Sequence, residues 1–313
     1  MKPLNLIPIK PNLNFTGQRM FFFGFSLLLI LASIVIFIAR DLNYGIDFQG
    51  GILVEVRVDR AGKLGEMRQR LTNLGLGEVS LQEFGAPTDI LIRIQKQAGG
   101  EKAQQAAIDK VKRELGPGVK YRRTEFVGPK VSEELFQDGV TAVFLAIIGI
   151  LLYIWFRFEW QFGIGAIVAL CHDVITTVGI LALTGIEFNL STVAAILTIA
   201  GYSINDTVVV YDRVRENLRK YKSLSLFELL NNSVNETLSR TVMTSVTTLL
   251  ALLSLYILGG EVIRGFSFAM IWGVLVGTYS SICLAVPLLL YFDIDRGTSR
   301  ASDKSDNVKE SIS

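Results

Sequence analysis

The stretch MFFFGFSLLLILASIVIFIA, from Met20 to Ala39, contains no charged residue and is long enough to cross a membrane as a helix. A hydrocarbon core of about 30 Å requires about 20 apolar residues in helical form. The run is too long for the core of a signal peptide, and no A-x-A-like cleavage site follows it. The sequence therefore predicts that the fold begins with a permanent transmembrane helix.

Five further apolar blocks follow, and 50% of all residues are hydrophobic. Apolar residues gathered into blocks, rather than spread in an amphipathic pattern, indicate a membrane protein. We therefore expect a membrane α-helical fold with six transmembrane helices, the later five near 135–156, 162–184, 189–211, 241–258 and 266–291. The predicted parts are a cytoplasmic tail at 1–19, a first span at 20–39, an outer domain at 40–132, a five-helix transmembrane domain at 133–292 and a disordered cytoplasmic tail at 293–313.

The orientation in the membrane follows from the position of the cations. The segment 212–240 is rich in arginine and lysine, whereas the short turns near Gly185 and Gly259 hold only Arg264. Cytoplasmic loops of membrane proteins carry the excess of lysine and arginine. Both termini are therefore expected in the cytoplasm and the 40–132 domain outside it.

The outer domain shows the pattern of a small α/β unit. Apolar residues alternate with polar ones over 51–59, as in a half-buried strand, and recur every three or four residues over 64–74, as on one face of a helix. A Gly85-Ala-Pro turn, a strand around 90–94, a helix over 101–115 and a weaker strand over 119–126 follow. The order strand, helix, strand, strand, helix, strand predicts a ferredoxin-like domain, a fold that does not specify a function.

Between the fourth and fifth spans, Ser225 and Glu228 have the spacing of a helix capping box, and leucines follow on one face. This pattern predicts a short helix lying on the cytoplasmic membrane surface.

Several functional classes are excluded by composition. A net charge of +2 leaves no broad basic field for a nucleic-acid partner, and the chain lacks the GxxxxGK[ST] signature of an ATP site. Cys171 and Cys283 fall inside apolar spans without metal-ligand spacing, so both are expected to be small buried hydrophobes. Neither a metal nor another cofactor nor an enzymatic activity is predicted.

Three ionisable residues within or bordering the spans are candidates for function. A charged side chain within a span costs about 2.5–3.5 kcal/mol on insertion scales, so it usually has a role. Asp206 lies well inside the fourth span, Asp173 lies beside His172 near the middle of the third, and Arg240 opens the fifth. The plain alternatives are a carboxylate that only fastens helices, a hydrogen-bonded packing pair, and an ordinary cation at the cytoplasmic surface.

The depth of Asp206 and Arg240 favours a functional pairing. The fourth span runs toward the cytoplasm and the fifth runs away from it, so both residues fall in the cytoplasmic half of the membrane. At 1.5 Å per residue, their depths match within about one turn. Protonation of the acid would break such an ion pair, which predicts a proton switch.

Two other readings use the same acids differently. Asp173 and Asp206 on neighbouring helices would suit an intramembrane aspartyl protease, but the chain reads Ser-Ile-Asn-Asp where a GxGD motif is expected. In a passive scaffold, the buried charges would be purely structural.

Two short motifs join the outer domain to the spans. Asp47-Phe48-Gln-Gly50-Gly51 leads from the first span into the first strand, and paired glycines permit backbone angles that other residues resist. Phe126-Val-Gly128-Pro129 leads from the last strand into the second span. Neither motif carries catalytic groups, and simple connectors are the plain alternative.

Taken in order, six motifs resemble those of SecF members of the SecD/SecF family of bacterial protein-export proteins. They are DFQGG (47–51), FVGPKVSEEL (126–135), RFEW (157–160), CHDV (171–174), GYSINDTVVVYDRVREN (201–217) and SRT (239–241), and they cover nearly the whole chain.

The resemblance implies a six-helix half of an assembly similar to transporters of the resistance-nodulation-division type. It implies a SecD-like partner, work on the SecYEG channel in the bacterial inner membrane, and a translocating polypeptide as client. It also places Asp206 and Arg240 in a proton-transport site driven by the proton-motive force. Asp173 is predicted as a third member of this proton relay. A proton-driven half-transporter exporting a small molecule or a lipid is the alternative function.

Overall fold

The computed structural model describes residues 12–58 and 64–294. Six helices in this part of the chain are long and apolar enough to cross a membrane, which confirms the predicted number. They are α1 (Arg19–Arg40), α5 (Pro129–Arg157), α6 (Trp160–Thr184), α7 (Leu190–Lys220), α8 (Leu226–Leu258) and α9 (Glu261–Ser280). The last span continues beyond α9 through a π-helical segment, η1 (Ser281–Ala285), a short helix, α10 (Val286–Leu288), and a 3₁₀ turn, η2 (Leu289–Tyr291).

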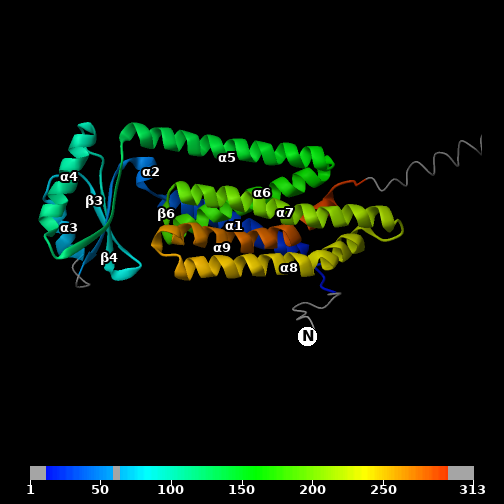
Figure 1. Cartoon of the computed structure of the whole chain (residues 1–313). Coiled ribbons are helices and arrows are strands. Elements are labelled where there is room, and N and C mark those ends of the chain that lie inside the picture. The colour runs from blue at the N-terminus through cyan, green and yellow to red at the C-terminus, as the bar shows by residue number, and fades with distance from the viewer. Residues whose placement is uncertain (1–11, 59–63, 295–313) are drawn as a thin grey trace, which may run out of the picture.

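The outer domain lies at one end of the helix bundle (Figure 1). It consists of β2 (Gly51–Val58), α3 (Leu64–Thr72), β3 (Val79–Phe84), β4 (Ala86–Ile94), α4 (Gly100–Leu115) and β5 (Val119–Val127). The strands form one antiparallel sheet in the order β3-β4-β2-β5. This order and the succession of elements confirm the predicted ferredoxin-like fold.

The alternation along β2 separates two faces of the sheet. Ile52, Val54 and Val56 are fully buried against α3 and α4, which lie on the side of the sheet away from the bundle (Figure 1). Leu53 and Leu91 point to the other face and pack with Ile46. The second face therefore looks toward the membrane helices.

Three short elements at the junction were not predicted. They are β1 (Asn43–Tyr44), α2 (Ile46–Gln49) and β6 (Glu187–Phe188), and β1 pairs with β6 in parallel. Each strand has only two residues, too few to produce a periodic pattern. The pair ties the end of the first span to the segment that precedes α7.

Packing differs strongly among the membrane helices. In the most apolar window of α5, 6% of the residues are buried, compared with 72% for the span Val262–Tyr291. Figure 1 shows α5 running along the outside of the bundle, while α7 lies against α8 and α9. The face of α5 away from the bundle is therefore exposed in this single chain.

Two expectations were wrong in detail. The predicted short surface helix is the beginning of α8, one unbroken helix capped by Ser225, whose hydroxyl accepts the Glu228 N–H at 3.2 Å. No glycine or proline interrupts residues 226–258, so nothing separates a surface helix from the span. Cys171 is exposed, whereas Cys283 is buried as predicted, because Cys171 lies on the outward face of α6. The predicted tails fall mostly outside the described residues.

Candidate functional site: buried polar groups and the outer junction

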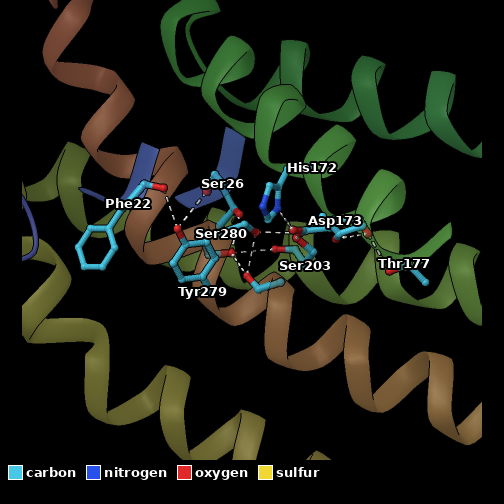
Figure 2. A network of polar contacts seen from close by, with 12 residues as sticks. Phe22, Ser26, His172, Asp173, Thr177, Ser203, Tyr279 and Ser280 are labelled. Atoms are coloured by element: carbon cyan, nitrogen blue, oxygen red, sulfur yellow. Dashed lines mark hydrogen bonds and ion pairs between the residues drawn. The ribbon is translucent and has the colours of Figure 1, made fainter. Parts of the chain in front are cut away.

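Asp173 on α6 is fully buried at the meeting point of three helices. Its Oδ1 atom lies 2.9 Å from Nδ1 of His172. Its Oδ2 atom accepts hydrogen bonds from the hydroxyls of Ser203 on α7 and Ser280 on the last span, at 2.5 and 2.8 Å (Figure 2). Both carboxylate oxygens are therefore occupied, as a buried carboxylate requires.

The same network reaches the first span. The Tyr279 hydroxyl donates to the backbone oxygen of Phe22 and lies 3.0 Å from the Ser26 hydroxyl (Figure 2). The rings of Tyr279 and His172 lie 6.0 Å apart. Nε2 of His172 is buried and has no hydrogen-bond partner among the described residues. Four spans thus meet around His172 and Asp173.

Asp206 on α7 is 5% exposed and has a different environment. Within residues 12–58 and 64–294, its Oδ2 atom has no hydrogen-bond partner, and neither has the Thr241 hydroxyl. The polar groups of α8 beside this buried carboxyl are the Thr241 side chain and the Arg240 cation. It is thus a buried acid with an unoccupied acceptor atom.

Asp206 on α7 and Arg240 on α8 lie on two helices that pack against each other. No ion pair joins them among the described side chains, so Arg240 acts on the acid through space. Nor does a hydrogen bond join Asp206 to Asp173 in that part of the chain, and the two acids do not share a proton as a protease pair would. The proton-switch role of these residues stays a prediction.

The π-helical segment at the end of α9 lies beside these acids. The Ser281 hydroxyl lies 2.8 Å from that of Thr207, the residue after Asp206. The Tyr211 hydroxyl donates to the backbone oxygen of Ala285 at 3.1 Å. Pro287 lacks an N–H and cannot complete the helical bonding pattern, which accounts for the irregular segment. The proline was the sequence signal for this feature.

The DFQGG motif is more than a connector. Oδ2 of Asp47 accepts the backbone N–H of Leu190, the first residue of α7, at 3.0 Å. A carboxylate at a helix N-terminus satisfies a free donor and meets the positive end of the helix dipole. The Phe48 ring contacts those of Phe136 and Phe188. The motif therefore binds three separate segments together.

The glycines of the two motifs do different work. Gly50 and Gly51 have positive φ angles of 70° and 120°. A Cβ on Gly51 would lie 2.5 Å from the backbone oxygen of Ile94, so no side chain fits there. Gly128 has an ordinary φ and open space around it, and it precedes Pro129 at the first turn of α5. Glycine is therefore required by the backbone conformation at Gly50 and Gly51, and not at Gly128.

One junction contact was missed by the sequence reasoning. Nη2 of Arg93 on β4 lies 2.6 Å from Oε2 of Glu187 on β6. Nη1 of the same arginine donates to Oδ1 of Asn43 on β1 at 2.8 Å. These residues are far apart in the sequence and carry no motif, so only the fold brings them together.

Histidine, cysteine, aspartate and glutamate side chains of the described residues form no group of three that could hold a metal ion. The candidate site consists of protonatable and hydrogen-bonding groups.

Comparisons with known proteins agree with this architecture. The family described as "Protein export membrane protein SecD/SecF, C-terminal" matches residues 107–295, and the "SecD/SecF GG Motif" matches residues 35–61. The chain is 46% identical over 294 residues to a protein translocase subunit SecF of Rickettsia rickettsii, covering 93% of this chain and 95% of that protein. It is also 46% identical over 311 residues to that of Cereibacter sphaeroides, covering 96% of each.

Solved structures give the same result. The crystal structure of SecDF, a translocon-associated membrane protein from Thermus thermophilus, superposes with a TM-score of 0.83 at 37% identity, over 91% of this chain and 39% of that chain. A second SecDF structure, in a super-membrane-facing form, gives 0.66 at 35% identity, over 97% of this chain and 41% of that one. The chain thus spans about two-fifths of each SecDF chain.

Proposed function

The chain belongs to the SecD/SecF family of protein-export membrane proteins, and we propose that it works as the SecF-like half of a proton-driven export complex. The other half would be a SecD-like subunit, since this chain matches about two-fifths of the SecDF chains. The complex would act beside the SecYEG channel on polypeptides in late steps of their export. The function requires no chemical reaction by this chain.

The observation that carries the proposal is the unoccupied oxygen of Asp206. A charged carboxylate buried in a membrane is costly unless its acceptors are filled. A proton would fill the Oδ2 position and remove the charge, and Arg240 would then lose its electrostatic counterpart. The two protonation states therefore favour different arrangements of α7 and α8, as a gradient-driven machine requires.

The role of Asp173 is a second part of the proposal. The sequence assigned it to the proton relay, but both of its oxygens already have hydrogen-bond partners. Its geometry favours the hydrogen-bonded packing reading. We assign Asp173 to fastening the helices that position Asp206.

Export by the complex, reconstituted with its partner, tests the role of Asp206 and Arg240. Asp206→Asn keeps the shape and removes the titration, so assembly should be normal and gradient-driven export should be lost. Arg240→Met should behave in the same way. Asp212→Asn is the matched control, because Asp212 lies on the same helix but is exposed and paired with Arg157. It should keep normal export.

A purely structural pair predicts another pattern. Each single change would then reduce assembly by leaving one charge uncompensated, and the double change to neutral residues would restore assembly and export. Recovery of export in the double variant at matched protein level would refute the proton switch.

We also propose the bacterial inner membrane as the location, with both termini in the cytoplasm. The cations gathered at the end of α7 and just after it, from Arg213 to Lys222, support this orientation. A reporter active only outside the cytoplasm should work when fused near Lys96 and fail near Lys222. The opposite result would invert the topology.

A further inference from the structure

The outer domain is attached to the segment before α7 by a partly buried polar contact. The contact, here called the junction latch, consists of Arg93 on β4, Glu187 on β6 and Asn43 on β1. The Arg93 and Glu187 side chains are 17% and 21% exposed. Nη1 of Arg93 also approaches the backbone oxygen of Tyr44 at 3.3 Å. The arginine therefore has partners on both strands of the β1–β6 pair.

The sheet end of the latch is rigid. β4 is an inner strand that is hydrogen-bonded to β3 on one side and to β2 on the other. A force on Arg93 is therefore passed to the whole sheet rather than to one flexible loop.

At the membrane end of the latch, Glu187 is joined to α7 by a short, fixed turn. Glu187 precedes α7 by three residues, and the intervening turn is fixed by a capping box between Asn189 and Thr192. α7 then runs without a break to Lys220. Asp206 lies on it, about 24 Å from Leu190 at 1.5 Å per residue. A shift of α7 therefore moves Glu187.

The rest of the interface leaves room for movement. A cavity of about 300 Å³ separates the open face of the sheet from the outer ends of the membrane helices. Its walls include Glu55 and Arg123 from the sheet, and Tyr256 and Arg264 from the bundle. The sheet is thus not fully packed onto the bundle, and the latch lies at one edge of the gap.

We propose that the Arg93–Glu187 ion pair is the coupling contact through which the position of α7 is transmitted to the outer domain. The inference rests on the proposed function, because it takes Asp206 as the group that sets the position of α7. Arg93 and Glu187 are positioning residues: neither carries the proton, and each acts through the helix or the sheet to which it belongs.

Gly45 provides a way to disturb the latch without removing a charge. Its φ angle of −74° suits any residue, but a Cβ there would lie 2.5 Å from Oε1 of Glu187 and 3.1 Å from Cβ of Asn189. The carboxylate is the end of a flexible side chain and can move aside. Gly45→Ala should therefore shift Glu187 away from Arg93 while the fold remains intact.

The test measures proton flux and gradient-driven export separately in the full complex with its partner. Arg93→Gln and Glu187→Gln should keep proton flux and assembly, and export should fall about fivefold or more, the lower end of typical coupling between two sites. The exchanged pair, Arg93→Glu with Glu187→Arg, should recover export in part. Gly45→Ala should give a smaller loss of export with the same sign.

A matched control removes an ion pair on the far side of the same domain. Arg70 on α3 pairs with Glu114 on α4, away from the junction, and Arg70→Gln should leave export unchanged. Normal export by both Arg93→Gln and Glu187→Gln would overturn the proposal. An equal loss of proton flux, export and assembly would also overturn it, because it would indicate a purely structural role for the ion pair. Absence of proton flux in the unchanged complex contradicts the proposed function instead. Export by the exchanged pair then still decides whether the latch couples the two parts.

Discussion

Asp173 and Asp206 are both buried carboxylates within the helix bundle, but their surroundings differ. Asp173 has a partner on each oxygen, with donors from α7 and the last span and His172 beside it. Among the described residues, the Oδ2 atom of Asp206 has no hydrogen-bond partner, and the polar groups beside this acid are the Thr241 side chain and the Arg240 cation on α8. Burial alone therefore does not distinguish these two acids, and the number of carboxylate oxygens with a hydrogen-bond partner does.

The difference has a thermodynamic meaning. A buried carboxylate whose hydrogen bonds are complete stabilises the arrangement that provides them, and it resists any change that removes a donor. A buried carboxylate that lacks a hydrogen-bond partner carries an uncompensated desolvation free energy in every arrangement of the helices. A bound proton, or a helix shift that supplies a donor, lowers this free energy. Asp173 thus suits a fixed point, and Asp206 suits a group with two states.

The largest expected effect comes from removing the Asp173 carboxylate. Asp173→Ala would remove the shared partner of Ser203, Ser280 and His172; Ser280 keeps the backbone oxygen of Gly277, whereas the buried Ser203 hydroxyl would lose its acceptor, at a cost of about 1–3 kcal/mol. We expect a marked loss of assembled protein and a lower unfolding temperature in detergent. Thermal unfolding followed by size-exclusion chromatography measures both quantities.

Asp206→Asn is the matched variant for that comparison. It changes an equally buried acid on the neighbouring helix, but it strands no donor, so the unfolding temperature should stay the same or rise slightly. Ser280→Ala, which removes one donor and leaves the others, should fall between the two. Equal losses for Asp173→Ala and Asp206→Asn would remove the distinction between the two sites.

Much of the fold could be predicted because its signals are local. Apolar blocks define the spans, and the alternation of Ile52, Val54 and Val56 defines the central strand of the outer domain. The division of α8 into two helices was wrong, because a capping box marks where a helix begins and says nothing of how far it continues. The two-residue strands β1 and β6 are too short to give a pattern at all.

The site could be predicted only in part. A charged residue inside an apolar span is conspicuous, so Asp173 and Asp206 were found from their positions alone. Their different surroundings could not be predicted in this way, because Ser280 is remote in sequence and serine is common in membrane helices. The Arg93–Glu187 pair could not be predicted either, because the two residues are far apart in the sequence and meet only in the folded chain.

Asp89 in the outer domain is a third buried carboxylate. Its substitution is expected to lower stability least of the destabilising variants considered. Asp89 is satisfied by ion pairs rather than hydroxyls: Nε and Nη2 of Arg57 donate to it at 2.5 and 2.6 Å, and Nη1 of Arg122 at 3.0 Å. The hydrogen bond from Arg57 holds the pKa of Asp89 below its usual value. The stabilisation is therefore complete above the unfolded pKa of about 3.9 and is lost as the pH falls through the lower folded pKa.

Residues 41–130, expressed alone, allow this to be measured without the membrane. They contain the whole sheet and both of its helices, so we expect a folded domain with a modest core. Asp89→Asn should lower the unfolding temperature at pH 6, because it leaves the arginines without their carboxylate. The difference from the unchanged domain should shrink between pH 4 and pH 2, since acid removes the same charge from Asp89 itself. The effect should be small, because Arg57 is 45% exposed and solvent screens the pair. Parallel curves across this range would mean that Asp89 contributes through packing alone, and that a satisfied carboxylate need not depend on its charge.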